Sequence, residues 1–127
     1  MQQQEKLTLP ELPLGFGDLG VLRDIIQAYL VFLPRSGLPA PERERETQLS
    51  KGVLYKLADI PQQSTEVRIT LTVGEIHTLR SAMQVFITFV RQKVAPSRER
   101  DETLADVARL RQILLDLLHQ SSARNRV

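Results

Sequence analysis

Hydrophobic residues recur at helical spacing in four segments of the chain, and prolines separate most of these segments. In the first segment the apolar positions are Leu19, Leu22, Ile26, Tyr29, Leu30 and Leu33. Ile25 and Phe32 widen this stripe to about half of the helical wheel, which is typical of a helix with more than one neighbour. The pattern predicts a central helix from about Gly17 to Leu33 that ends before Pro34.

The second helical segment begins at Pro41, because proline suits the first turn of a helix, and it ends before Pro61. Its inward positions are Leu49, Val53, Leu57 and Ile60. Gly52 lies inside this stripe, where glycine costs about 1 kcal/mol relative to alanine. It either permits close packing against a neighbouring helix or marks a break.

Two more helices follow in the second half of the chain. The third begins after the sequence TVGE at residues 72–75, which has the form of a capping box, and it runs to about Val94. Its inward positions are Ile76, Leu79, Met83, Phe86 and Val90. The fourth runs from about Arg98 to about His119, and Ser97 can cap its first turn.

Two short segments have the pattern of β-strands. Glu66 to Leu71, EVRITL, alternates cleanly between polar and apolar side chains. Leu7 to Leu14 alternates more loosely and contains Pro10 and Pro13, which restrict it to an edge strand or an extended arm.

The chain repeats itself at a distance of 57 residues. LRDIIQAYLVFLP, residues 22–34, reappears as LRSAMQVFITFVR, residues 79–91. The identical pairs are Thr8/Thr65, Leu14/Leu71, Gly17/Gly74, Leu22/Leu79, Arg23/Arg80, Gln27/Gln84, Phe32/Phe89, Pro39/Pro96, Glu42/Glu99 and Arg43/Arg100. Unrelated sequences would match at roughly one position in fifteen. A shared hydrophobic stripe does not explain the glycine, proline and Glu-Arg matches, so we interpret the pattern as an internal repeat.

The predicted fold is therefore mainly α, a four-helix domain from an internal β-α-α duplication with pseudo-two-fold symmetry. One repeat unit spans about 8–60 and the other about 65–117, within a single domain of residues 1–127 whose tails, 1–6 and 120–127, are expected to fray. We expect the first and third helices at the centre and the second and fourth outside them. The two extended segments could then pair as a small two-stranded antiparallel ribbon.

Composition narrows the class of protein. Of 127 residues, 42% are hydrophobic and 5% aromatic, which indicates a globular domain with an aliphatic core. Cysteine is absent, which excludes disulfides and thiolate chemistry. There is neither a membrane-length apolar run nor a signal-peptide pattern, so we expect a cytoplasmic protein without membrane association. The net charge is only +2, and the acidic and basic residues of the chain are interspersed.

Five polar residues are candidates for binding. Arg23 and Gln27 lie at i, i+4 beside the first hydrophobic stripe, and Arg80 and Gln84 repeat them. Two such clamps could hold an anion, a carboxylate or a nucleic-acid backbone. The alternative, which we prefer, is that each arginine braces the bundle by pairing with an acidic neighbour. Arg111 lies on the stripe of the last helix, so it requires an ion pair, a protomer interface or a ligand.

Catalytic and cofactor motifs are absent from the sequence. His77 and His119 are the only histidines, and neither has a metal-ligand partner at a helical spacing. LGFGDLG at residues 14–20 lacks the strand and βαβ context of a phosphate-binding loop. We therefore expect no cofactor, no metal and no enzymatic activity.

These features favour an interaction or regulatory module that contacts another protein, most simply a homodimer. Ala28, Val31, Val85 and Thr88 lie outside the predicted stripes, and they would form an apolar patch if no helix covers them. The alternative is a nucleic-acid-binding accessory protein that uses arginine side chains, which the isoelectric point of about 9.3 favours.

Overall fold

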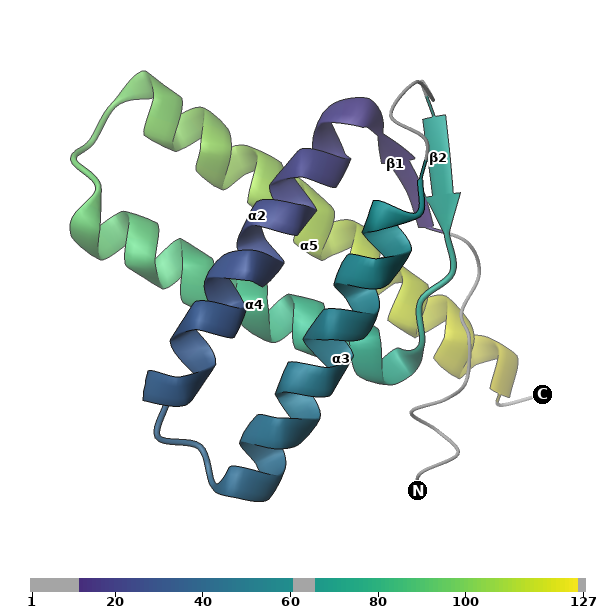
Figure 1. Ribbon diagram of the computed structural model, residues 1–127. Helices are drawn as coiled ribbons and strands as arrows, with labels where there is room; N and C mark the ends of the chain where they lie inside the picture. Colours follow the sequence, from purple (N-terminus) through teal and green to yellow (C-terminus); the bar gives the residue numbers. More distant parts are fainter. Residues whose placement is uncertain (1–11, 61–65, 126–127) are drawn as a thin grey trace.

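The computed structural model describes residues 12–60 and 66–125, and over these residues the protein is mainly α (Figure 1). The helices are α2 (Phe16–Phe32), α3 (Ala40–Ala58), α4 (Val73–Lys93) and α5 (Arg98–Asn125), with a 3-10 turn, η1 (Leu33–Arg35), after α2. Two strands, β1 (Leu12–Gly15) and β2 (Glu66–Ile69), complete the described elements. The predicted N-terminal tail, residues 7–11 of the predicted arm and the 61–65 loop lie outside the described residues.

The helices form two hairpins, α2–α3 and α4–α5, which cross where α2 passes α4 (Figure 1). Both hairpins turn at the side of the molecule away from the strands. The α4 helix packs against α2, α3 and α5. The α3 helix packs against both α2 and α4, whereas α5 packs mainly against α4. The two outer helices therefore contact the central pair unequally, which differs from a fully symmetric bundle.

The two strands pair in an antiparallel ribbon beside the helices (Figure 1). In its register Leu12 lies opposite Ile69 and Gly15 lies opposite Glu66. The ribbon joins the start of the first hairpin to the start of the second, because α2 directly follows β1 and α4 begins shortly after β2.

Local sequence signals set most of the helix ends. The capping box before α4 is confirmed: the Glu75 amide donates to Thr72 Oγ1 over 3.1 Å, and the Thr72 amide donates to Glu75 Oε1 over 2.9 Å. Ser97 Oγ accepts a hydrogen bond from the Arg100 amide at the start of α5. Gly37, with a φ of 78°, allows the backbone to turn between η1 and α3.

One predicted helix end was wrong. We expected α5 to end near His119 and residues 120–127 to fray, but the helix continues to Asn125. The sequence SSAR after Gln120 contains neither glycine nor proline, so nothing in the backbone stops the helix there.

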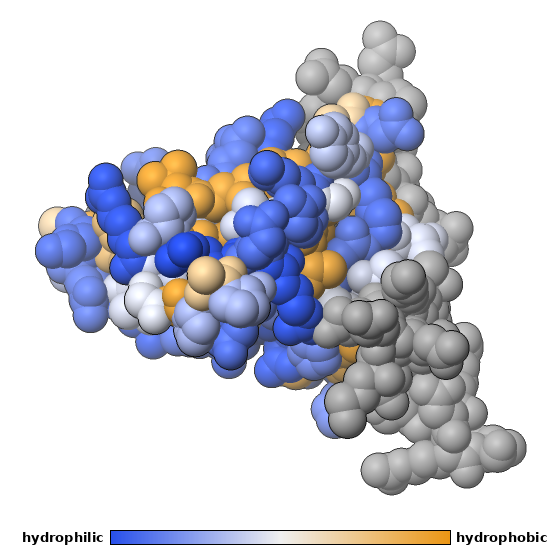
Figure 2. Space-filling model, turned by 60° about the horizontal axis from the view of Figure 1, so that its bottom comes forward, coloured by the Kyte–Doolittle hydropathy of each residue, from blue (hydrophilic) through white to orange (hydrophobic). Residues whose placement is uncertain are grey.

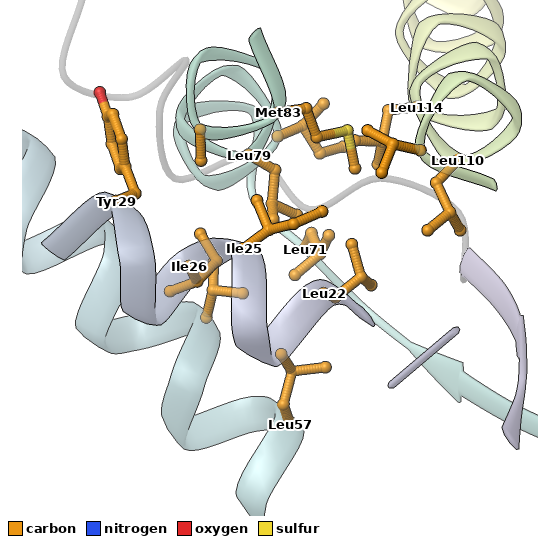
Figure 3. Packing of buried hydrophobic residues seen from close by; sticks show 14 of the residues in the cluster. Leu22, Ile25, Ile26, Tyr29, Leu57, Leu71, Leu79, Met83, Leu110 and Leu114 are labelled. Carbon is orange, nitrogen blue, oxygen red and sulfur yellow. The ribbon is translucent and has the colours of Figure 1, made fainter. Parts of the chain in front are cut away.

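The hydrophobic core joins all four helices and the segment that contains β2. Figure 3 shows its side chains pointing toward one another between α2, α4 and α5. The fully buried residues include Leu22, Ile25, Ile26, Leu79, Met83, Leu110 and Leu114. All of these except Leu110 lie on the stripes that helical periodicity predicts, so most of the core follows from the hydrophobic pattern.

Two carboxylates of α3 and α4 add polar contacts between the helices. Glu46 Oε2 of α3 accepts hydrogen bonds from Tyr29 Oη of α2 over 3.4 Å and from Thr78 Oγ1 of α4 over 2.6 Å. Glu75 of α4 is buried and forms an ion pair with Lys56 of α3. Because these groups are partly or fully shielded from water, they fix the position of α3 relative to the central helices.

Gly52 permits the close approach of α3 to α4. A Cβ atom at this position would lie 3.0 Å from Glu75 Oε2, and the helix continues through the glycine without a break. Of the two roles considered for Gly52, close packing is therefore the one that the structure supports.

Candidate functional site

An uncovered apolar groove lies between α2 and α4. Its volume is about 640 Å³. The residues that line it are Ile25, Ala28, Tyr29, Val31, Phe32, Arg35, Ala82, Gln84, Val85, Phe86, Thr88, Phe89 and Gln92. Among them are Ala28, Val31, Val85 and Thr88, the four residues expected to form a patch if left uncovered.

The groove exposes large hydrophobic side chains. Val31 is 69% exposed, Phe89 is 56% exposed and Phe32 is 37% exposed. Phe32 belongs to the widened stripe that predicts a central helix, yet it lies on the groove wall, where its ring stacks on Tyr29 with the centroids 6.1 Å apart. Figure 2 shows hydrophobic side chains reaching a largely hydrophilic surface on the face that it presents. Hydrophobic surface of this kind is typical of a site for a protein or an apolar ligand.

The two walls of the groove carry residues at matching places in the sequence. Six lining residues of α2 and η1 each have a lining residue of α4 57 positions later. The pairs are Ile25/Ala82, Ala28/Val85, Tyr29/Phe86, Val31/Thr88, Phe32/Phe89 and Arg35/Gln92. Among the described residues that line the groove, only Gln84 lies outside this scheme. The groove thus lies between the two segments that resemble each other most in sequence.

Tyr29 is the lining residue of the groove whose pKa is shifted. Its side chain is buried, and burial together with the nearby Glu46 carboxylate raises the pKa of the Tyr29 phenol to about 12. The hydroxyl therefore keeps its proton at neutral pH and serves as a hydrogen-bond donor to Glu46.

A second, polar hollow lies between α4 and α5. Its volume is about 380 Å³, and it is lined by His77, Arg80, Ser81, Gln84 and Arg111. Arg111 Nη1 donates a hydrogen bond to Gln84 Oε1 over 3.1 Å. Arg80 Nε is buried and has no hydrogen-bond partner among the described residues. The structure thus brings together three of the five candidate binding residues.

The other two candidates lie elsewhere. Arg23 and Gln27 are both exposed on α2, and Arg23 lines a separate hollow against the end of α3, beside Leu57 and Ile60. The two Arg-Gln pairs therefore do not form one clamp.

The ion pairs expected for Arg80 and Arg111 are not formed. Within the described part of the chain neither guanidinium lies within salt-bridge distance of a carboxylate. One acidic residue of a neighbouring helix, Asp18 of α2, pairs instead with Arg109 of α5 over 2.6 Å. That bond raises the pKa of Arg109 above its usual value.

Comparisons with known proteins add no relative. No family model matches this chain, and neither a curated protein nor a solved structure matches it. Residues 12–60 and 66–125 contain no helix long and apolar enough to cross a membrane, and no cluster of three or more potential metal ligands. The groove and the hollow are thus the features from which a function can be argued.

Several contributors to these sites are not evident from the sequence. Its pattern places Phe32 in the widened stripe of a central helix, and it assigns no site to Phe89, His77 or Ser81. His77, Ser81 and Gln84 follow one another at spacings of four and three residues, so a helical wheel places them on one face with Arg80 beside it. The wheel could not show that Arg111 of another helix lies opposite.

Proposed function

We propose that the protein is an interaction module that forms a homodimer through the α2–α4 groove. The observation that supports this proposal is the exposure of Val31, Phe32 and Phe89 on faces of α2 and α4 that no other described helix covers. Water contact with these side chains is unfavourable by about 25 cal/mol per Å² of apolar surface, so a partner that buries them gains free energy. A cytoplasmic location stays a prediction from the sequence.

We also propose that the chain is an internal duplication and that the groove lies on its pseudo-two-fold axis. The strand register supports this, because Leu12 pairs with Ile69 and these residues are 57 positions apart. The starts of α2 and α4, Phe16 and Val73, are separated by the same distance. Equivalent residues of the two halves therefore face each other at two places, in the ribbon at the starts of α2 and α4 and in the groove near their ends. A two-fold axis would pass through both places.

The acidic residues of two ion pairs also lie at matching positions of the two halves. Asp18 and Glu75 are 57 positions apart, near the starts of α2 and α4. Asp18 pairs with Arg109 of α5, and Glu75 pairs with Lys56 of α3. Each half thus supplies a cation from its outer helix to the acid of the other half, although the two cations, Lys56 and Arg109, do not lie at equivalent positions of the repeat.

A second copy of this chain is the partner that the groove fits best. A dimer interface with two-fold symmetry uses the same patch on both copies, so that patch must be complementary to itself. The groove offers both a hollow and projecting side chains, of which Val31 and Phe89 project most. Arg35 is the one charged residue among those that line it, so two copies would meet with little like-charge repulsion.

Light scattering coupled to size exclusion tests the homodimer. We expect a mass of two chains at high micromolar concentration, and a mass of one chain for Val31→Glu, which adds a charge to the apolar interface. Tyr55→Glu is the matched control, because Tyr55 is 77% exposed on α3 and does not line the groove. A monomeric wild type, or equal loss of the dimer in both variants, would contradict the proposal.

Nucleic-acid binding is the alternative function, and a heparin column distinguishes it from the homodimer proposal. We expect the protein to pass through at moderate salt, because its net charge is only +2. Strong retention that falls steeply with salt, by a monomeric protein, would favour nucleic acid as the partner instead.

A further inference from the structure

The hollow between α4 and α5 contains two arginines without anionic partners. Arg80 and Arg111 both line it, and neither forms an ion pair with the residues that the structure describes. Gln84 occupies one donor of Arg111. The buried Arg80 Nε has no acceptor, which costs free energy because the group has lost its water without gaining a partner.

The remaining side chains of the hollow are also able to donate. Gln84 contributes an amide group, which also donates to Thr88, and His77 contributes an imidazole. Ser81 contributes a hydroxyl that also bonds to Tyr29. Several donors and two fixed positive charges in one hollow suit a tetrahedral dianion better than a carboxylate, which has fewer acceptor atoms and a single charge. The volume of about 380 Å³ leaves room for a small group attached to that anion.

We propose that this hollow binds a phosphate group, either as free inorganic phosphate or as the monoester of a small molecule. Arg80 and Arg111 hold the phosphoryl oxygens by charge-assisted hydrogen bonds, and Ser81 and Gln84 complete the contacts. The site is separate from the proposed dimer contact, because Arg80 and Arg111 do not line the apolar groove.

The N-terminal half supplies a natural comparison for this site. Arg23 and Gln27 are the residues 57 positions before Arg80 and Gln84, and Leu54 is the residue 57 positions before Arg111. The hollow at Arg23 is lined by Gly17, Leu19, Gly20, Leu57, Ala58 and Ile60, so among the described residues no second cation lines it. We therefore expect no phosphate site on α2.

Titration of the full chain with inorganic phosphate at constant ionic strength, followed by NMR of backbone amides and arginine side chains, tests the proposal. We expect saturable shifts around residues 77–84 and 111. Arg80→Gln and Arg111→Gln should each weaken binding about tenfold or more, since each removes charged hydrogen bonds. Arg23→Gln should leave binding unchanged. Arg111 is only partly buried, so its variant is expected to fold even if Arg80→Gln does not.

Two further titrations define the ligand. If the hollow accepts a monoester, glycerol 3-phosphate should bind at least as tightly as inorganic phosphate. If glycerol 3-phosphate binds more weakly, the ligand is free phosphate alone. Succinate at equal ionic strength should bind more weakly than phosphate. Non-saturating shifts with phosphate, an equal loss in Arg23→Gln, or tighter binding of succinate would overturn the proposal.

Discussion

The N-terminal hairpin, α2–α3, and the C-terminal hairpin, α4–α5, use similar sequences for their cores and different ones for their outer contacts. Leu22 of α2 and Leu79 of α4 are both completely buried, at positions 57 residues apart. Gly52 of α3 and Arg109 of α5 are also 57 residues apart, yet their side chains act in opposite ways. The glycine admits Glu75 to within contact distance, whereas the arginine extends to Asp18 from a half-exposed position.

This difference accounts for the unequal packing of the outer helices. A helix whose contact residue is glycine can approach its neighbour closely, and α3 packs on both α2 and α4. A helix that contacts its neighbour through a long arginine side chain stays further away, and α5 packs mainly on α4. Two cores of similar sequence therefore accommodate outer helices with different contacts, and among the described residues the hollow that two arginines line lies in the C-terminal hairpin.

The largest expected effect comes from the shared core. Leu22→Ala and Leu79→Ala should each reduce the free energy of unfolding by about 2–5 kcal/mol, because both remove a fully buried side chain and leave a cavity. The two losses should agree to within about 1 kcal/mol if the halves contribute equally. Urea unfolding followed by circular dichroism measures both, and a much smaller loss for either variant would show that its half is not part of the common core.

The two acidic residues at the starts of α2 and α4 should differ in importance. Glu75→Ala removes the capping box and the buried pair with Lys56, so we expect a loss of about 3 kcal/mol. Asp18→Ala breaks a pair whose arginine is half exposed, so we expect a loss of about 1 kcal/mol or less. Equal losses in thermal or urea unfolding would refute the difference between the halves.

Tyr29 and its counterpart Phe86 differ by a hydroxyl, which makes the N-terminal half sensitive to alkali. The folded pKa of Tyr29 is about 12 against about 10 in an unfolded chain. The contribution of this group to stability is complete below pH 10 and is lost as pH rises toward 12, by about 2 kcal/mol. Tyr29→Phe should remove this part of the pH dependence in urea unfolding, and an unchanged slope would contradict it.

The smallest expected effects concern two helical glycines. Gly20→Ala places a methyl group in open space on α2, so it should stabilise the protein by up to about 1 kcal/mol. Gly52→Ala has the same advantage in helix propensity, but its methyl would lie 3.0 Å from Glu75 Oε2, which offsets the gain. Melting temperatures of the two variants test whether α3 approaches α4 as closely as the structure indicates.

The sequence predicted the parts of the fold that depend on local pattern. Helical periodicity located the four helices and most of the core, and the TVGE motif located the cap of α4. The polar contacts between helices were not predictable in the same way. Glu46 bonds to Tyr29 and Thr78, and Arg111 bonds to Gln84, because the fold brings together residues up to 32 positions apart. Helix spacing alone does not determine such contacts.

The candidate sites show the same difference between features that a local pattern predicts and contacts that depend on the fold. That Ala28, Val31, Val85 and Thr88 lie outside the core stripes followed from the helical wheel, and the structure leaves them uncovered. Arg80 and Arg111 were expected to have acidic partners, because an arginine that lies along a helix bundle usually pairs with an acidic neighbour. In the described part of the chain the acids Asp18 and Glu75 pair instead with Arg109 and Lys56, which only the three-dimensional arrangement reveals.

The central claim, that two copies meet at the α2–α4 groove, is tested most directly by cross-linking single-cysteine variants. The chain contains no cysteine, so Val31→Cys, Thr88→Cys and Tyr55→Cys each carry one reactive thiol. A short bifunctional maleimide should give covalent dimers in high yield from Val31→Cys and Thr88→Cys and few from Tyr55→Cys. Equal yields from all three variants, or no dimers from the two groove variants, would contradict the account.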